Sequence, residues 1–165
     1  MEIWEDRERE KIDQDKIYLI SEILYIYVCV LYFFYTRKMG ELEAKRVLVV
    51  DDNIHSCMLA QKFTEYVGIA SHNITVVMNW ISAVEEATKN KYDIIIMDVG
   101  MPGMDGIAAS KEIKSHYSEN KPKIIAYTAD LLPNTQVDIE AFDEIIYKPA
   151  DKKRFSQTLF AVLNG

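Results

Sequence analysis

The segment Asp93-Ile-Ile-Ile-Met-Asp98-Val-Gly-Met-Pro-Gly-Met-Asp-Gly106 joins a continuous apolar run to an acidic residue and a loop rich in glycine. The run from Ile94 to Met97 predicts a strand buried on both faces, as the central strands of parallel sheets are. Asp98 then lies at the carboxyl end of that strand, the edge where open α/β sheets bind ligands. Because aspartate is also common in turns, this segment alone leaves two interpretations of Asp98 open, a site residue or a turn residue.

The composition sets limits on the class of protein. A length of 165 residues suits one domain with an appendage, and 49% apolar with 27% charged residues is typical of a globular chain with a core. The formal net charge of −7 argues against nucleic acid as a partner, since such proteins carry a basic surface. Cys29 and Cys57 match no metal-ligand spacing and lie in apolar or helical surroundings, so a reducing interior is expected.

The first 44 residues differ from the rest. Residues 1–16 are dense in charges of both signs and predict a solvated helix or a frayed terminus. Residues 17–36 are apolar and aromatic, close to the ~20 residues that a helix needs to span a bilayer. Glu22 argues against a span, and the lysines and arginines on the two sides balance, so no orientation follows.

Three interpretations of residues 17–36 therefore stay open. The segment is a membrane span, or a hydrophobic helix that packs against a partner or a second copy in a homodimer, or a region upstream of a natural start at Met39. Residues 37–44 are assigned as a linker to a domain over residues 45–164.

From Lys45 onward, short apolar runs alternate with amphipathic segments. The runs predict strands over residues 47–50, 74–78, 93–98, 123–128 and 144–149. Helical spacing predicts helices over about residues 55–67, 82–89, 107–116 and 152–163, the first of them ending at Gly68, with a less regular stretch over 129–142. Five strands that alternate with helices predict a doubly wound α/β fold, a parallel sheet covered on both faces with right-handed crossovers.

Polar residues follow four of the predicted strands. Asp51 and Asp52 follow the first, Asp98 the third, while Thr128 ends the fourth and Lys148 the fifth. In a doubly wound sheet all of them converge at the carboxyl edge. Three carboxylates there repel one another and suit Mg²⁺, whereas a lysine and a hydroxyl suit a phosphoryl group, which an aspartate can accept covalently. Taken singly, each residue has a plainer explanation, such as a helix cap.

Residues 45–164 resemble the receiver domain of two-component response regulators and hybrid histidine kinases. The matching motifs are Val47-Leu-Val-Val-Asp-Asp-Asn53, Met97-Asp-Val-Gly-Met-Pro-Gly-Met-Asp-Gly106, Ala126-Tyr-Thr-Ala129 and Lys148-Pro149. The resemblance implies a flavodoxin-like strand order 2-1-3-4-5, preceded here by the hydrophobic N-terminal helix.

The resemblance also implies the chemistry of the acceptor. Asp98 accepts a phosphoryl group from a phosphohistidine on a histidine kinase or histidine phosphotransfer protein. Asp52 and Asp98 bind Mg²⁺ directly together with the backbone carbonyl of Gly100, and Asp51 acts mainly through water.

The groups that hold the phosphoryl oxygens follow from the same resemblance. Thr128 donates a hydrogen bond to them, the backbone N–H of Ala129 assists, and Lys148 forms an ion pair. The Lys148–Pro149 peptide bond is expected to be cis, a form that about 5–6% of X–Pro bonds take in folded proteins.

The output side departs from the family pattern. Ile145 stands where receivers usually carry an aromatic residue, and Tyr147 is expected to point to the face away from Lys148. The interval from Thr128 to Lys148 is about two residues short, contains Pro133 and lacks the usual glycine before the fifth strand. The sequence therefore predicts phosphorylation without predicting the threonine–aromatic switch.

Four further positions bear on the acceptor site. Trp80 stands where the family often has a small residue, and the sequence suggests no role for it. Val99, Gly100 and Asp130 lie near the predicted phosphoryl site and are expected to tune the lifetime of the phosphate, in a direction that the sequence does not give.

The leading hypothesis is a Mg²⁺-dependent phosphoacceptor in a phosphorelay. Its receiver domain is cytoplasmic, and the chain is membrane-anchored if residues 17–36 span. It has no separate catalytic domain, because no ATP-binding glycine-rich segment is present. The alternatives are an interaction module that does not cycle phosphate and a receiver fragment of a hybrid histidine kinase. A phosphatase of the haloacid dehalogenase kind is disfavoured, since Gly100 stands where a second aspartate is wanted.

Overall fold

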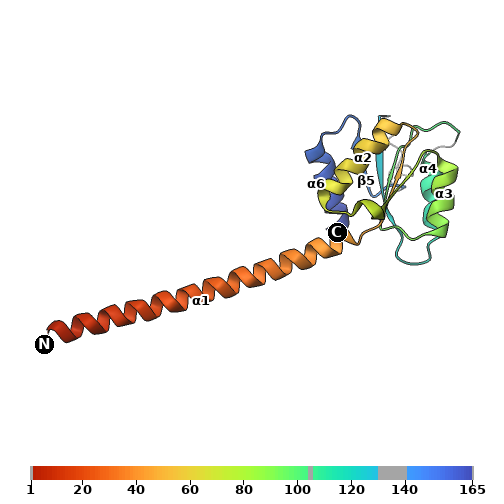
Figure 1. Ribbon diagram of the computed structural model, residues 1–165. Helices are drawn as coiled ribbons and strands as arrows, with labels where there is room; N and C mark the ends of the chain where they lie inside the picture. The colour runs from red at the N-terminus through yellow and green to blue at the C-terminus, as the bar shows by residue number, and fades with distance from the viewer. Residues whose placement is uncertain (1, 104–105, 130–140, 165) are drawn as a thin grey trace. The chain divides into compact units, whose positions relative to one another are not determined.

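The computed structural model describes residues 2–103, 106–129 and 141–164. The chain divides into two compact units between Gly40 and Glu41. Helix α1 (Glu2–Glu43) forms the first unit as far as Gly40, and its last three residues belong to the second unit (Figure 1). Within α1, the 26 residues Tyr18–Glu43 are long and apolar enough to cross a membrane, although a signal sequence or a buried helix meets the same two criteria.

The second unit contains a five-stranded parallel sheet in the order β2-β1-β3-β4-β5. The strands are β1 (Val47–Val50), β2 (Ile74–Val77), β3 (Ile94–Met97), β4 (Lys123–Thr128) and β5 (Glu144–Tyr147). The predicted strand positions, the strand order and the doubly wound class are confirmed.

Helices cover both faces of the sheet (Figure 1). They are α2 (Ile54–Val67), α3 (Trp80–Lys89), α4 (Gly106–Ser115) and α6 (Lys152–Asn164), with a short 3-10 helix η1 (Ser71–Asn73). Helices α2 and α6 pack on one face and α3 and α4 on the other. The expected irregular stretch over 129–142, with Asp130 and Pro133, falls largely outside the described residues, as does Asp105.

Two apolar clusters form the core, one on each face of the sheet. Along β3, Ile94 and Ile96 belong to the cluster under α2 and α6, whereas Ile95 and Met97 belong to the cluster under α3 and α4. Successive side chains of a strand point to opposite faces, so a strand covered on both sides must be apolar throughout. This explains why β1 and β3 are fully buried and why the run before Asp98 has no polar interruption.

Both ends of α2 follow local capping rules. The Asn53 side chain accepts hydrogen bonds from the backbone N–H groups of His55 and Ser56, which satisfies donors in the first turn. Gly68 takes the left-handed conformation at φ 110° and ends the helix, as predicted.

The last turn of α1 packs into the second unit. Leu42 is buried, and the Glu43 carbonyl accepts a 2.8 Å hydrogen bond from the Asn73 side chain. Residues 41–43, which the sequence assigned to a linker, thus contact the α/β unit directly.

The register of the sheet aligns the carboxyl ends of its strands. Val50 pairs with Val77 on one side and Met97 on the other, and Met97 pairs with Ala126. The residues that follow β1 and β3, and the last residues of β4, therefore lie along one edge.

Candidate functional site

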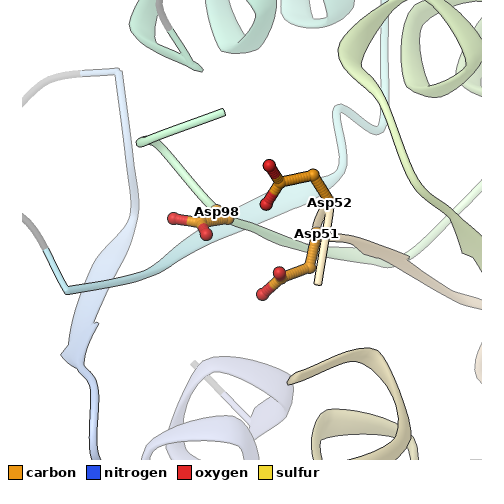
Figure 2. Close-up of side chains that lie close together, drawn as sticks. All are labelled: Asp51, Asp52 and Asp98. Atoms are coloured by element: carbon orange, nitrogen blue, oxygen red, sulfur yellow. The ribbon is translucent and has the colours of Figure 1, made fainter. Parts of the chain in front are cut away.

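Three carboxylates gather at the carboxyl edge of the sheet. Asp51 and Asp52 directly follow β1, and Asp98 directly follows β3 (Figure 2). Each contributes an oxygen to a set whose members all lie within 4.8 Å of one another. Asp51 is buried, the Asp98 side chain is 12% exposed and Asp52 is exposed, so the cluster opens to solvent on the Asp52 side.

Lys148 joins two of these carboxylates. Its Nζ lies 2.6 Å from Asp51 Oδ2 and 2.7 Å from Asp98 Oδ2, and its side chain is only 15% exposed. Burial by itself lowers the pKa of the Lys148 ammonium, but the hydrogen bonds and charges of Asp51 and Asp98 outweigh it and raise the pKa. Lys148 is therefore a cation throughout the physiological pH range.

The backbone holds the other oxygen of each bridged carboxylate. Asp51 Oδ1 accepts a 2.9 Å hydrogen bond from the Asn53 N–H, and Asp98 Oδ1 accepts one of 3.1 Å from the Gly100 N–H. The Asp98 N–H in turn donates to the Val50 carbonyl at 2.8 Å, which ties the end of β3 to β1. Both carboxylates are thus oriented before any ligand arrives.

The donor set fits a divalent cation. Three carboxylates and one ammonium leave a formal surplus of two negative charges in a partly buried cluster. Such a surplus is costly unless a cation compensates it, and Mg²⁺ takes a few carboxylate oxygens while it keeps several waters. The exposure of Asp52 leaves room for those waters.

The strands also bring Thr128 and Ala129 to this edge. Thr128 is the last residue of β4, lies two positions beyond the partner of Met97, and is fully buried. Its carbonyl accepts a 2.8 Å hydrogen bond from the Lys148 N–H, which connects the ends of β4 and β5. Ala129 follows and is exposed. The Lys148–Pro149 bond is cis, as expected.

Two residues near the site were not anticipated. The Cys57 thiol is buried and donates to the Asp51 carbonyl at 3.2 Å, and burial followed by the charge of Asp51 raises its pKa. The Tyr127 ring lies under Lys148, with its centroid 5.0 Å from Nζ. The sequence placed Cys57 in a predicted helix and Tyr127 in a predicted strand, but it carried no signal for either contact.

The loop after Asp98 is shaped by close backbone contact. A Cβ on Gly106 would lie 2.7 Å from the Val99 Cα, so only glycine fits where α4 begins. Gly103 has φ +102°, and a Cβ there would lie 3.3 Å from Trp80 Nε1. Trp80 also packs, partly buried, against the cluster that contains Met101, so the structure gives it a role as support for this loop.

The departure from the family pattern at Ile145 of β5 is also present in the structure. Ile145 is partly buried and packs against the apolar cluster on the α3 and α4 face. An aliphatic side chain fills the place where the family pattern has an aromatic one.

Comparison with known proteins agrees with this geometry. Residues 47–160 match the response regulator receiver domain family. The peroxide stress-activated histidine kinase mak1 of Schizosaccharomyces pombe is 32% identical over 126 residues, which cover 72% of this chain and 8% of that kinase. The sensor protein GacS of Pseudomonas syringae is 31% identical over 122 residues, or 71% of this chain and 13% of that protein.

Solved structures share the fold. The receiver domain of a Pseudomonas aeruginosa sensor histidine kinase, with a magnesium ion coordinated in its active site cleft, is 26% identical with a TM-score of 0.64. The alignment covers 73% of this chain and 98% of that one. The Thermotoga maritima response regulator TrrA, in complex with Mg²⁺ and beryllofluoride, is 26% identical with a TM-score of 0.63, over 72% and 98% of the two chains.

The chain spans a small part of these two curated relatives, 8% and 13% of their lengths. The matched part is the whole α/β unit from β1 into α6, which includes the three carboxylates and Lys148. The chain belongs to the response regulator receiver domain family.

Proposed function

We propose that Asp98 accepts a phosphoryl group from a phosphohistidine on a histidine kinase or histidine phosphotransfer protein. The P–N bond of the phosphohistidine breaks and its electron pair returns to the imidazole. A P–O bond forms to a carboxylate oxygen of Asp98, which makes an aspartyl phosphate. Hydrolysis by water later releases inorganic phosphate and returns the carboxylate, so the site can accept a phosphoryl group again.

The observation that carries this proposal is the surplus of carboxylates around one buried ammonium. Lys148 spans Asp51 and Asp98 at 2.6 and 2.7 Å, so a phosphoryl group on Asp98 would be within reach of the same ammonium. Charge-assisted hydrogen bonds of this kind are short and strong, and they act on charge that develops during transfer.

Mg²⁺ is the cofactor that we propose for this site. Asp52, Asp98 and the Gly100 carbonyl would hold it, with Asp51 acting through water. Bound there, it would neutralise the oxygens of the incoming phosphoryl group. Support comes from the cluster of carboxylate oxygens and from the two related receivers solved with magnesium.

Thr128 and Ala129 complete the proposed phosphoryl site. The Thr128 hydroxyl and the Ala129 N–H would donate hydrogen bonds to the phosphoryl oxygens opposite Lys148. Their place at the end of β4, next to β3 in the sheet, supports this role.

The test uses the full chain in detergent with acetyl phosphate and Mg²⁺, and measures intact mass. Wild type is expected to gain one phosphoryl group, and Asp98→Asn to gain none. Glu144→Gln is the matched control, because Glu144 is an exposed carboxylate at the amino end of β5, the opposite edge of the sheet. If wild type gains no adduct, or if Asp98→Asn gains as much, the acceptor proposal is wrong.

The same measurement separates the main alternative. A receiver-like module that docks partners without cycling phosphate would give no adduct in wild type, while it kept its partners. The family matches are segments of long kinases, so the chain could also represent the receiver portion of a hybrid histidine kinase. Transfer from a purified phosphotransfer protein, compared with transfer from a kinase, would identify the donor.

We further propose that residues 17–36 attach the chain to a membrane and leave the receiver over residues 45–164 in the cytoplasm. The described side chains from Tyr18 to Tyr35 are all exposed, although most of them are apolar or aromatic. Exposure of the same apolar surface to the hydrocarbon core of a bilayer would cost little free energy. Recovery of the full chain in the soluble fraction without detergent would refute attachment and favour a helix that packs on a partner or a second copy.

A further inference from the structure

Besides its two carboxylate partners, Lys148 lies over an aromatic ring. Its Nζ lies 5.0 Å from the centroid of the Tyr127 ring, inside the ~6 Å range of cation–π attraction. Tyr127 is 3% exposed, so little water competes for the ammonium on this side. The ammonium is therefore held by Asp51 and Asp98 in one direction and by a ring in another.

The sheet register explains why these two side chains meet. Tyr127 pairs with Ile146 across β4 and β5, and both belong to the apolar cluster under α2 and α6. Lys148 comes two residues after Ile146, so its side chain leaves the backbone on the same face. Diagonal neighbours on one face of a sheet are within reach of a long side chain.

The ring itself is held in place from below. It makes an edge contact with Phe155 of α6, at 5.4 Å between centroids and an interplanar angle of 82°. Phe155 is fully buried and packs against Phe63 of α2, with 5.3 Å between the two ring centroids. Phe155 thus links the Tyr127 ring of β4 to Phe63 of α2, and this aromatic packing favours one position of the Tyr127 ring.

From this geometry we infer that Tyr127 is a positioning residue, whose ring face holds the Lys148 ammonium at the level of the phosphoryl group. The inference rests on the proposed function of Asp98. Two carboxylates compete for the ammonium in the metal-free protein, whereas phosphorylation would present a third partner. A ring attracts the ammonium without a directional bond, so it keeps the ammonium at the site while its anionic partner changes.

The test is a double-mutant cycle on the full chain in detergent, with beryllofluoride and Mg²⁺ as the probe and calorimetry as the readout. Tyr127→Leu removes the ring face and Tyr127→Phe keeps it. Each is made in the wild-type background and in Lys148→Met. Tyr127→Leu is expected to weaken beryllofluoride binding about 2- to 30-fold in the wild-type background and to change little in Lys148→Met. Tyr127→Phe is expected to bind beryllofluoride with the affinity of wild type.

A second readout avoids the ligand. Urea unfolding of the same variants without Mg²⁺ gives the coupling between Tyr127 and Lys148 in the free protein, and a coupling that favours the native state is expected. If Tyr127→Leu unfolds too readily for calorimetry, Tyr127→Met replaces it as a flexible apolar filler of the same space.

Several results would overturn the inference. They are an equal loss of affinity in both Lys148 backgrounds, a Tyr127→Phe variant as weak as Tyr127→Leu, or full affinity in Tyr127→Leu. Failure of the acceptor proposal itself would look different. Wild type would then bind no beryllofluoride, or Asp98→Asn would bind it as tightly as wild type.

Discussion

The two edges of the sheet use the same residue types in different proportions. At the amino edge, Asp93 bonds Lys45 at 2.8 Å and the Arg46 N–H at 2.9 Å. Asp143 there meets Lys123 and Lys114, both at 3.1 Å, and the Ile124 N–H at 2.9 Å. At the carboxyl edge three aspartates gather and one lysine bridges two of them, Asp51 and Asp98. At the amino edge each of these two carboxylates has at least one lysine partner, which stabilises the fold, whereas the surplus of carboxylates at the carboxyl edge stores negative charge that a cation can neutralise.

The metal affinity should show the largest difference between the edges. Asp52→Asn removes a proposed ligand and is expected to weaken Mg²⁺ binding by about 10- to 100-fold, since both charge and an oxygen donor are lost. Asp93→Asn at the amino edge is expected to leave the affinity within about twofold. Calorimetric titration of Mg²⁺ into each variant measures this, and equal losses at both edges would contradict the comparison.

The stability of the metal-free protein should respond with opposite signs. Asp143→Asn leaves two lysines and a backbone N–H without their anion, so it is expected to cost about 1–3 kcal/mol of unfolding free energy. Asp52→Asn relieves repulsion from Asp51 and Asp98 and is expected to be neutral or stabilising by up to about 1 kcal/mol. Urea unfolding in EDTA measures both free energies of unfolding. An Asp52→Asn variant less stable than wild type would contradict the surplus of negative charge at the carboxyl edge.

Acid should remove the contribution of Asp143. Burial by itself raises the pKa of this carboxyl, but the Ile124 N–H and the two lysines outweigh it and lower the pKa. A lowered pKa in the folded state gives stability that is present above the unfolded value of about 3.9 and is lost as pH falls through the folded value. Between pH 6 and pH 3, wild type is therefore expected to lose more stability than Asp143→Asn. Parallel pH profiles for the two proteins would exclude this contribution.

The smallest expected effect concerns an exposed partner at the amino edge. The Lys123 side chain is 52% exposed, against 23% for Lys114. Exposed ion pairs contribute little, so Lys123→Met is expected to cost about 0.2–1 kcal/mol, and Lys114→Met somewhat more. Thermal unfolding at low and high salt checks the order, and a larger loss in Lys123→Met would reverse it.

Prediction from the sequence succeeded where local pattern and topology suffice. Apolar runs such as Ile94 to Met97 located the strands, and Gly68 ended α2 as expected. The rule that parallel strands present their carboxyl ends at one edge then brought Asp51, Asp52, Asp98 and Lys148 together, which the distances confirm. The family followed from the motifs at those strand ends.

Other features needed the packed molecule. Asp51 and Asp52 are adjacent in the sequence, yet Asp51 is buried and contacts Lys148 and the Asn53 N–H, whereas Asp52 is exposed. Trp80 had no assigned role until its contact with the loop around Gly103 was visible. The edge contact between Tyr127 and Phe155 joins residues far apart in the chain, and no periodicity encodes it.

The sequence by itself determined the order of strands and helices, the edge that carries the site and the chemical types gathered there. These depend on hydrophobic periodicity and on chain direction, which are local properties. Only the tertiary structure decided which oxygen each donor meets, that Lys148 bridges Asp51 and Asp98, and that an aromatic ring lies beneath it. Such contacts depend on rotamers and on packing between distant segments, so they exist only once the core has formed.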